Sequence, residues 1–177
     1  MRLLGAIIAG GAARRFGADK GAALLGGKAL IDHVADALRT QCDALVIVGR
    51  DWPGIQRVND RPGPGEGPLG GLAGALHHAW AEGFDAVLCA GCDTLPIPDD
   101  LYDRLTPGPA VVEGQWLFGL WPVNLSKSLD QWLASQADRS IRGFLREAGA
   151  RLVPLDHDFL NINTQEALAE AERGLKT

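Results

Sequence analysis

Short, uninterrupted runs of hydrophobic residues recur along this chain, and between them hydrophobic residues recur every three or four positions. An uninterrupted run predicts a strand that is covered on both faces, whereas the wider spacing predicts a helix with one hydrophobic face. The predicted strands span residues 3–9, 44–48, 55–58, 85–90, 110–113, 116–122 and 151–155. The predicted helices span residues 29–40, 69–82, 99–105, 125–136, 141–148 and 165–175. This alternation predicts an α/β fold, with a mostly parallel sheet covered by helices on both faces.

Two segments rich in glycine or proline interrupt this pattern and are predicted loops. Residues 10–20 follow the first strand, and residues 61–68 precede the second long helix. The second segment could link two domains, but the strand–helix pattern continues on both sides of it, which favours a loop inside one domain. In a parallel sheet, ligands bind beyond the carboxyl ends of the strands. We therefore expect the loops that follow Ala9, Val58 and Ala90 to converge on one site.

Composition and charge narrow the class of protein. A length of 177 residues suits a single domain, 1–177, and 46% hydrophobic with 22% charged residues is ordinary for a soluble globular protein. A net charge of −5 argues against a general nucleic-acid partner. No stretch reaches the roughly 20 apolar residues that span a membrane. The N-terminus resembles a signal peptide but has a single arginine before its apolar run, so we expect a cytoplasmic protein.

Cysteine spacing offers one alternative chemistry. Cys89 and Cys92 have the Cys-x-x-Cys spacing of some zinc sites, at the end of a predicted strand. A zinc site of that kind needs a second pair of ligands, and no second Cys/His pair has the required spacing. We therefore interpret both residues as reduced cysteines of a cytosolic protein.

The loop after the first predicted strand is a candidate for binding phosphates. Gly10 and Gly11 let backbone N–H groups approach a polyphosphate closely. Arg14, Arg15 and Lys20 supply positive charge to the same loop. The loop matches neither a Walker A motif nor a GxGxxG motif. An ordinary glycine-rich turn with solvated arginines accounts for the same residues equally well.

Polar residues near two other predicted strands are further candidates. Asp93 follows a buried strand, and a lone carboxylate there suits Mg²⁺ whose other ligands are water and substrate phosphates. The alternative is an aspartate that caps the helix near Pro98. Asn161 and Asn163 are two positions apart, so their amides would share one face of a short strand. The alternative is turn chemistry ahead of the last helix, which Thr164 can cap.

Four segments, in order along nearly the whole chain, match the motifs of one protein family. They read Ile8-Ala-Gly-Gly-Ala-Ala-Arg-Arg15-Phe-Gly-Ala-Asp-Lys20, Gly67-Pro-Leu-Gly-Gly71, Cys92-Asp-Thr-Leu-Pro-Ile-Pro98 and Asn161-Ile-Asn-Thr-Gln-Glu166. The chain thereby resembles the molybdenum cofactor guanylyltransferases, the MobA family. Because the four matches keep their order, the resemblance is far more specific than any single motif.

The resemblance implies a Rossmann-like three-layer αβα sandwich of the nucleotidyltransferase type. It implies an enzyme that uses Mg²⁺ to join the GMP part of GTP to the terminal phosphate of molybdenum-molybdopterin, with release of pyrophosphate. The nucleotide would bind in the half formed by about residues 1–105, and the pterin in the half formed by about 106–177. Molybdenum-insertion and molybdoenzyme-maturation proteins are candidate protein partners, and neither nucleic acid nor membrane is expected to bind.

The resemblance also implies roles for single residues. The catalytic residues would be Arg15, Lys20 and Asp93, and Asp93 would also hold the metal. The nucleotide-binding residues would be Ile8, Ala9, Gly10, Gly11, Lys20, Asp60, Gly67, Pro68, Leu69 and Asp93. The pterin-binding residues would be Arg139, Asn161 and Asn163.

The chain departs from the family pattern in three places. Phe16 replaces a methionine, Trp116 stands where relatives often have proline, and Val48-Gly49 replaces an asparagine that can contact the nucleotide. Two rival functions also remain at this point: a sister enzyme, such as a molybdopterin cytidylyltransferase or a sugar-phosphate nucleotidyltransferase, and a non-catalytic carrier of the pterin cofactor. Cytidylyltransferases tend to have Gly-Asp-Gln-Pro where this chain has Cys92-Asp-Thr-Leu, which disfavours the first rival.

Overall fold

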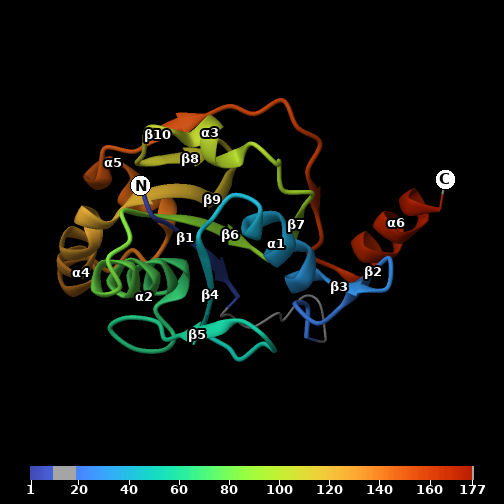
Figure 1. The fold of residues 1–177 in the computed structure, drawn as a ribbon, viewed down its shortest axis with the longest axis horizontal. Helices are drawn as coiled ribbons and strands as arrows, with labels where there is room; N and C mark the ends of the chain where they lie inside the picture. The colour runs from blue at the N-terminus through green and yellow to red at the C-terminus, as the bar shows by residue number, and fades with distance from the viewer. Residues whose placement is uncertain (10–18, 177) are drawn as a thin grey trace.

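A computed structural model describes residues 1–9 and 19–176 of the chain. Within these residues, a central sheet has seven strands in the order β10-β8-β9-β6-β1-β4-β5 (Figure 1). The strands are β1 (Leu3–Ile8), β4 (Ala44–Val48), β5 (Gln56–Val58), β6 (Ala86–Gly91), β8 (Ala110–Val112), β9 (Gln115–Pro122) and β10 (Arg151–Val153). Strands β6, β1, β4 and β5 run parallel, whereas β9 is antiparallel to both β6 and β8. The predicted mostly parallel sheet is confirmed.

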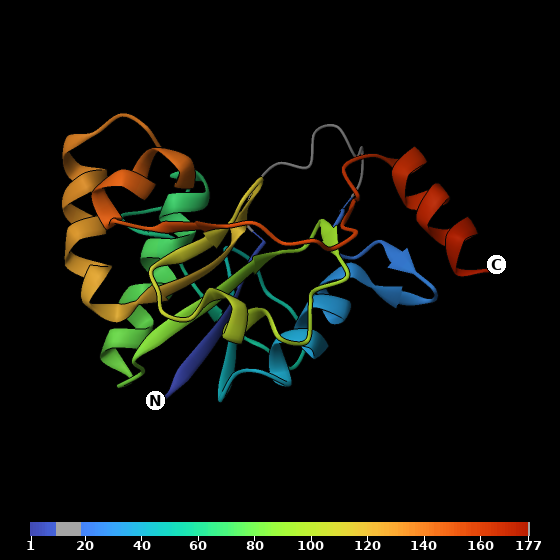
Figure 2. The ribbon, with the colours of Figure 1, turned by 90° about the horizontal axis from the view of Figure 1, so that it is seen from above.

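Helices cover both faces of this sheet, as the pattern predicts (Figures 1 and 2). They are α1 (Leu30–Arg39), α2 (Gly67–Ala81), α3 (Leu101–Leu105), α4 (Ser126–Ser135), α5 (Ile141–Ala148) and α6 (Gln165–Leu175). A 3₁₀ turn, η1 (Val123–Leu125), leads from β9 into α4. Helices α1 and α3 pack on one face, and α2, α4 and α5 pack on the other. None of the helices in the described residues is long and apolar enough to span a bilayer.

The central strand β1 shows why the strand segments read as unbroken hydrophobic runs. Leu3 and Ile7 contribute to the core under α1, while Leu4, Ala6 and Ile8 contribute to the core under α2. Successive side chains of a strand point to opposite faces, and both faces are buried here. A polar residue at any of these positions would lose its contact with water, so the alternation of polar and apolar residues disappears.

Two short strand pairs outside the central sheet were not predicted. Strand β7 (Thr94–Leu95) pairs antiparallel with β11 (Leu160–Asn161), and β2 (Leu24–Leu25) pairs with β3 (Lys28–Ala29). The hairpin of β2 and β3 lies with α6 at one end of the molecule, opposite α4 and α5 (Figure 2). Each strand has only two residues, which is too short for a periodic pattern in the sequence.

Helix α2 approaches the end of β5 unusually closely. A Cβ atom at Gly74 would lie 2.1 Å from the carbonyl oxygen of Asn59 and 3.5 Å from Cα of Asp60. Only a residue without a side chain allows this approach. The backbone of residues 59 and 60 therefore lies directly against α2, and Asp60 is held at the carboxyl end of the sheet.

We predict that Gly74→Ala destabilises the fold. Its methyl group would collide with a backbone oxygen that cannot rotate away, and overpacking of this kind costs about 1–3 kcal/mol. Gly174→Ala is the matched control, because a Cβ at this glycine of α6 meets nothing within 4 Å. The control should be neutral or stabilising by up to about 1 kcal/mol. Urea unfolding of both variants measures the difference, and equal stability would contradict the close packing of α2.

Candidate active site at the carboxyl edge of the sheet

Two hollows open near the carboxyl ends of the parallel strands. The larger, about 560 Å³, is lined by Asp93 and Thr94 after β6, residues 115–118 of β9, residues 139–142 and Asn161. We call it the Asp93 pocket. The smaller, about 400 Å³, is lined by Gly49 after β4 and by Asp60 with its neighbours in the 57–64 segment. We call it the Asp60 pocket. Both lie where a parallel α/β sheet binds its ligands.

Lys20 and Asp93 form an ion pair at the edge of the Asp93 pocket. Lys20 Nζ lies 3.1 Å from Asp93 Oδ2, and the two side chains are 19% and 27% exposed. Lys20 Nζ also donates to Asn163 Oδ1 at 3.4 Å. Three segments that are far apart in the sequence thus bring a cation, a carboxylate and an amide together. Such a cluster can bind phosphate groups and a metal ion at the same time.

The short pair of β7 and β11 is what carries the asparagines to Asp93. Thr94 pairs with Asn161 across this sheet, and the N–H of Ile162 donates to the carbonyl oxygen of Asp93 at 2.6 Å. Ile162 is buried, whereas Asn161 and Asn163 on either side of it are exposed. The strand itself ends at Asn161, so Asn163 lies just beyond it.

Thr94 is a member of the site that the sequence analysis missed. Its side chain is 6% exposed, and its hydroxyl donates to Asn161 Oδ1 at 3.0 Å. When the oxygen of the Asn161 amide accepts from Thr94, its N–H₂ group is left to donate elsewhere. The only signal in the sequence was the position of Thr94 next to Asp93, because its partner lies 67 residues away.

Aromatic and cationic side chains form the far wall of the Asp93 pocket. Trp116 lines it, and the guanidinium of Arg142 lies 5.6 Å from the centre of the Trp116 ring. Arg139 also lines the pocket, with its guanidinium hydrogen-bonded to Glu66 and to the carbonyl oxygen of Gln136. The wall is therefore a flat aromatic surface flanked by positive charge. Arg142 is the second residue of this pocket, after Thr94, that the sequence analysis did not identify.

Four other residues that the sequence predicts to bind the nucleotide lie at the end of β1 and at the start of α2. Ile8 ends β1 between Val48 and Gly91, and the N–H of Ala9 donates to the carbonyl oxygen of Val48 at 3.3 Å. Gly67 and Pro68 begin α2, and Pro68 lines the Asp93 pocket.

Of the remaining residues predicted for the site, one is described by the structure and four are not. The side chain of Leu69 is fully buried in the core under α2. Gly10, Gly11, Arg14 and Arg15 lie outside the described residues.

A second ion pair, which the sequence did not reveal, holds Asp19, the residue before Lys20. The two terminal guanidinium nitrogens of Arg50, Nη1 and Nη2, donate to the carboxylate of Asp19, at 2.6 and 2.7 Å. The hydrogen bonds from Arg50 lower the pKa of Asp19, so this carboxylate stays charged. Arg50 also lies over the ring of Trp52, at 5.1 Å. The pair joins the residue before Lys20 to the loop after β4.

The donor chemistry around Asp93 suits a hard cation and not zinc. Carboxylate, amide and hydroxyl oxygens meet here, and these are the ligands that Mg²⁺ takes in proteins. Burial raises the pKa of the Cys92 thiol to about 11 and that of Cys89 to about 12, so both stay protonated. No group of three or more His, Cys, Asp or Glu residues suited to a metal occurs in residues 1–9 and 19–176. Asp93 does not cap α3, which begins after Asp100.

Known proteins are similar in sequence to this chain over nearly its whole length. Residues 5–158 match the model of the MobA-like NTP transferase domain. A molybdenum cofactor guanylyltransferase from Cereibacter sphaeroides is 38% identical, with 99% of this chain and 98% of the relative covered. A protein of the same name from Acidiphilium cryptum is 34% identical over 95% of this chain and 93% of its own length.

A solved structure supports the fold. The molybdopterin-guanine dinucleotide biosynthesis protein A from Archaeoglobus fulgidus superposes with a TM-score of 0.77 at 20% identity, covering 98% of each chain. At this low sequence identity, the superposition is evidence for a shared fold and not for a shared function.

We predict that Asp60→Asn stabilises the protein at neutral pH. Burial raises the pKa of Asp60 above its usual 3.8, so the charged form costs folding free energy at pH values above the folded pKa. This cost disappears as the pH falls below the pKa of the unfolded chain. The variant should therefore unfold at higher urea concentration than the wild type at pH 7, with the gap closing toward pH 3.5.

The exposed Asp99 provides the matched control, because Asp99→Asn should change stability little at either pH. An Asp60→Asn variant that is less stable than the wild type at pH 7 would show that the carboxylate supports the fold. A carboxylate that is kept at a cost in stability is typical of a functional site.

Proposed function

This chain belongs to the MobA-like NTP transferase family, and from that membership we propose that it transfers GMP from GTP to the terminal phosphate of molybdenum-molybdopterin. Pyrophosphate is the second product. Relatives that are 32–38% identical over nearly their full length carry the name molybdenum cofactor guanylyltransferase, which favours this function over a sister cytidylyltransferase. The observation that carries the proposal is the convergence of Lys20, Asp93, Asn161 and Asn163 beside the Asp93 pocket.

The reaction requires positioning and charge neutralisation more than covalent help from the protein. An oxygen of the molybdopterin phosphate forms a bond to the α-phosphorus of GTP, and the bond from that phosphorus to the α–β bridging oxygen breaks. The electron pair of the broken bond leaves on pyrophosphate. No protein nucleophile takes part, so the enzyme contributes by aligning two anions that repel each other.

Lys20 is suited to bind the phosphates of the nucleotide. Its ammonium lies 3.1 Å from the carboxylate of Asp93, which balances its charge. The triphosphate offers Lys20 a second anionic partner, and this contact grows stronger as charge accumulates on the leaving pyrophosphate. Arg15, in the predicted phosphate loop, would share that task.

Asp93, with the neighbouring amide oxygens, is suited to hold a divalent cation, which members of this family use. We propose that the cation is Mg²⁺, because the donors are hard oxygens and the phosphates of the substrates complete its coordination. When bound, Mg²⁺ would neutralise phosphate oxygens and polarise the phosphorus that is attacked.

The two pockets suit the two substrates. We assign the nucleotide to the Asp60 pocket, to Ile8 and Ala9 at the end of β1 and to residues 67–69 at the start of α2. From the sequence we expect Gly10 and Gly11, which lie outside the described residues, to contribute to the same substrate site. We assign the pterin to the Asp93 pocket, where Asn161 and Arg139 supply hydrogen bonds and Trp116 supplies a flat apolar wall. One domain, 1–177, then carries both substrates at the carboxyl edge of the sheet.

The proposal predicts a preference for GTP. The purified chain, supplied with molybdenum-molybdopterin and Mg²⁺, should release pyrophosphate from GTP at least about tenfold faster than from CTP or ATP. Mass spectrometry of the pterin product should show the mass of added GMP. Omission of molybdopterin is the control for plain hydrolysis. Equal rates with the three nucleotides would overturn guanine selection, and product formation without any pyrophosphate would overturn the reaction.

Substitutions of the ion pair should separate chemistry from folding. Lys20→Ala and Asp93→Asn should each lower turnover by roughly 10²–10³, the loss typical for one preorganised charge. Melting temperatures should change little, because both side chains are partly exposed. Lys176→Ala and Asp99→Asn are matched controls at exposed positions distant from the site and should keep full turnover. Turnover near the wild-type rate in either site variant would remove that residue from the mechanism.

A further inference from the structure

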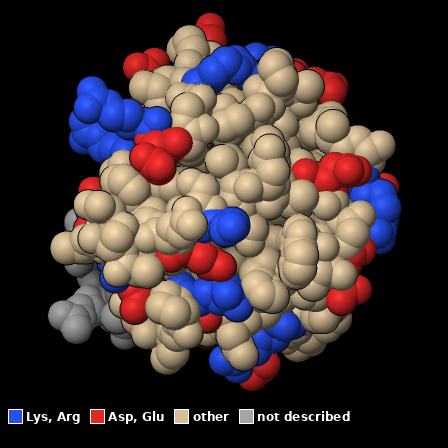
Figure 3. Space-filling view, turned by 90° about the vertical axis from the view of Figure 1, so that its left-hand side faces the viewer, with Lys and Arg blue, Asp and Glu red and all other residues tan. Residues whose placement is uncertain are grey.

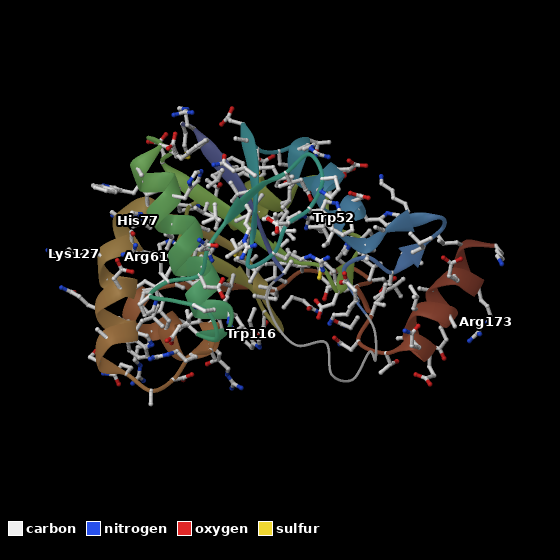
Figure 4. The ribbon with its side chains drawn as sticks, turned by 90° about the horizontal axis from the view of Figure 1, so that it is seen from below. Trp52, Arg61, His77, Trp116, Lys127 and Arg173 are labelled. Atoms are coloured by element: carbon white, nitrogen blue, oxygen red, sulfur yellow. The ribbon has the colours of Figure 1, made fainter. Side chains whose placement is uncertain are left out.

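A third hollow, of about 310 Å³, lies in the groove between α2 and α4. We call it the Trp80 pocket, and the proposed reaction makes no use of it. It shares no lining residue with the Asp93 or Asp60 pockets. Arg61, His77 and Lys127, which line it, lie together at one end of the molecule, whereas Trp52 and Arg173 lie toward the other (Figure 4).

The lining of the Trp80 pocket contains more cationic and hydrogen-bond-donating side chains than carboxylates. Arg61 and Lys127 are cationic, and Asn124 and Ser126 add an amide and a hydroxyl. Asp130 is the one carboxylate in the lining, and it is paired with Arg61 at 3.1 Å. Within the part of the chain that the structure describes, the ammonium of Lys127 has no ion-pair or hydrogen-bond partner. The pocket therefore has positive charge to spare and suits an anionic ligand.

An exposed indole stands beside these donors. Trp80 is 65% exposed, and the ring of His77 meets it edge to face, with centroids 6.0 Å apart. His77 and Trp80 are three residues apart on α2, so both point to the same side of the helix. Tryptophan and arginine are the residues most enriched among the energetic centres of protein–protein interfaces, because they combine apolar area with polar contacts.

We propose that the Trp80 pocket is a docking site for an acidic segment of a partner protein. A carboxylate of that segment would lie between Lys127 and Arg61, and an aromatic or aliphatic side chain next to it would cover Trp80. The charge of the pocket is complementary to such a segment, and the exposed indole gives it an apolar contact. Binding here leaves the carboxyl edge of the sheet open, so the partner could stay bound during catalysis.

The surroundings favour a protein over a nucleic acid or a free anion. The chain has a net charge of −5, and Asp130 lies in the pocket itself. A polyphosphate backbone, with one negative charge on every nucleotide, would therefore be repelled more strongly than a protein segment that carries one or two carboxylates. At the end of the molecule where α4 and α5 lie, uncharged residues cover most of the surface and charges of both signs are interspersed (Figure 3). Arg61 and Asp130 are 40% and 37% exposed, so a small anion would stay hydrated there.

A library of random twelve-residue peptides displayed on phage tests this proposal. Selection on the wild-type chain should enrich peptides in which Asp or Glu lies close to an aromatic or aliphatic residue. The affinity of the most enriched peptide, made with a fluorescent label, is then measured by anisotropy. Lys127→Glu and Trp80→Ala should each weaken it at least about tenfold, as expected for residues at the centre of an interface.

Both substitutions are compatible with the fold, because glutamate suits the first turn of α4 and alanine suits an exposed position of α2. Lys176→Glu and Leu24→Ala are matched controls at exposed positions elsewhere and should change the affinity less than about twofold. Guanylyl transfer should remain at the wild-type rate in all four variants, so the docking proposal stands or falls independently of the proposed reaction.

Several results would overturn the proposal. One is a selection without any acidic bias, and another is an affinity that Lys127→Glu and Trp80→Ala leave unchanged. Displacement of the peptide by a twelve-nucleotide single strand at equal concentration would assign the pocket to nucleic acid instead. Displacement by inorganic phosphate at millimolar concentration would assign it to a free anion.

Discussion

Hydrogen bonds to Asp93 hold the segments of the candidate site together. Its carboxylate accepts a hydrogen bond from the ammonium of Lys20, and its carbonyl oxygen accepts one from the N–H of Ile162 at 2.6 Å. The first contact joins β6 to the segment that follows β1, and the second joins it to the C-terminal segment. The hydrogen bond from Lys20 to Asn163 adds a direct link between these two segments. The position of Asp93 depends in turn on β6, a strand buried along its whole length at the centre of the sheet.

Close packing on the α2 face positions the other half of the site. Gly74 lets α2 lie against Asn59, which fixes the chain at the end of β5 and so locates Asp60. The same helix begins at the Asp93 pocket with Gly67 and Pro68. Helix α2 therefore lines the Asp93 pocket and packs against the segment that lines the Asp60 pocket, so a shift of α2 would alter both pockets together. This dual role accounts for a helix that is buried on most sides and has little amphipathic character.

Functions are distributed over different parts of the molecule. The carboxyl edge of the sheet carries the charged cluster and the two pockets that we propose for the substrates, as expected for a parallel α/β fold. The groove between α2 and α4 carries a separate pocket with an exposed tryptophan and with Lys127, whose ammonium has no partner among the described residues. A site that needs solvent-exposed side chains can sit on the outer surface of the helices, because the core beneath α2 and α4 is already filled.

The sequence by itself determined the layers of the fold and identified most of the residues that we place in the proposed site. Unbroken hydrophobic runs are diagnostic because a strand buried on both faces tolerates no polar side chain, and β4, α5 and α6 begin and end where the pattern predicts. The cap of the last helix is also confirmed, with Thr164 accepting from the N–H of Ala167 at 3.1 Å. Lys20, Asp93, Asn161 and Asn163 were identifiable from their motifs.

Only the tertiary structure decided how those residues meet. The pairing of β7 with β11 joins positions 94 and 161 through strands of two residues each, and so short a contact leaves no periodic signal. The roles of Thr94, Arg142 and the Asp19–Arg50 pair depend on partners that are distant in sequence. The antiparallel direction of β9 depends on how the chain returns to the sheet. Local sequence specifies which surfaces must be buried, whereas contacts between distant segments are settled only when those surfaces are packed together.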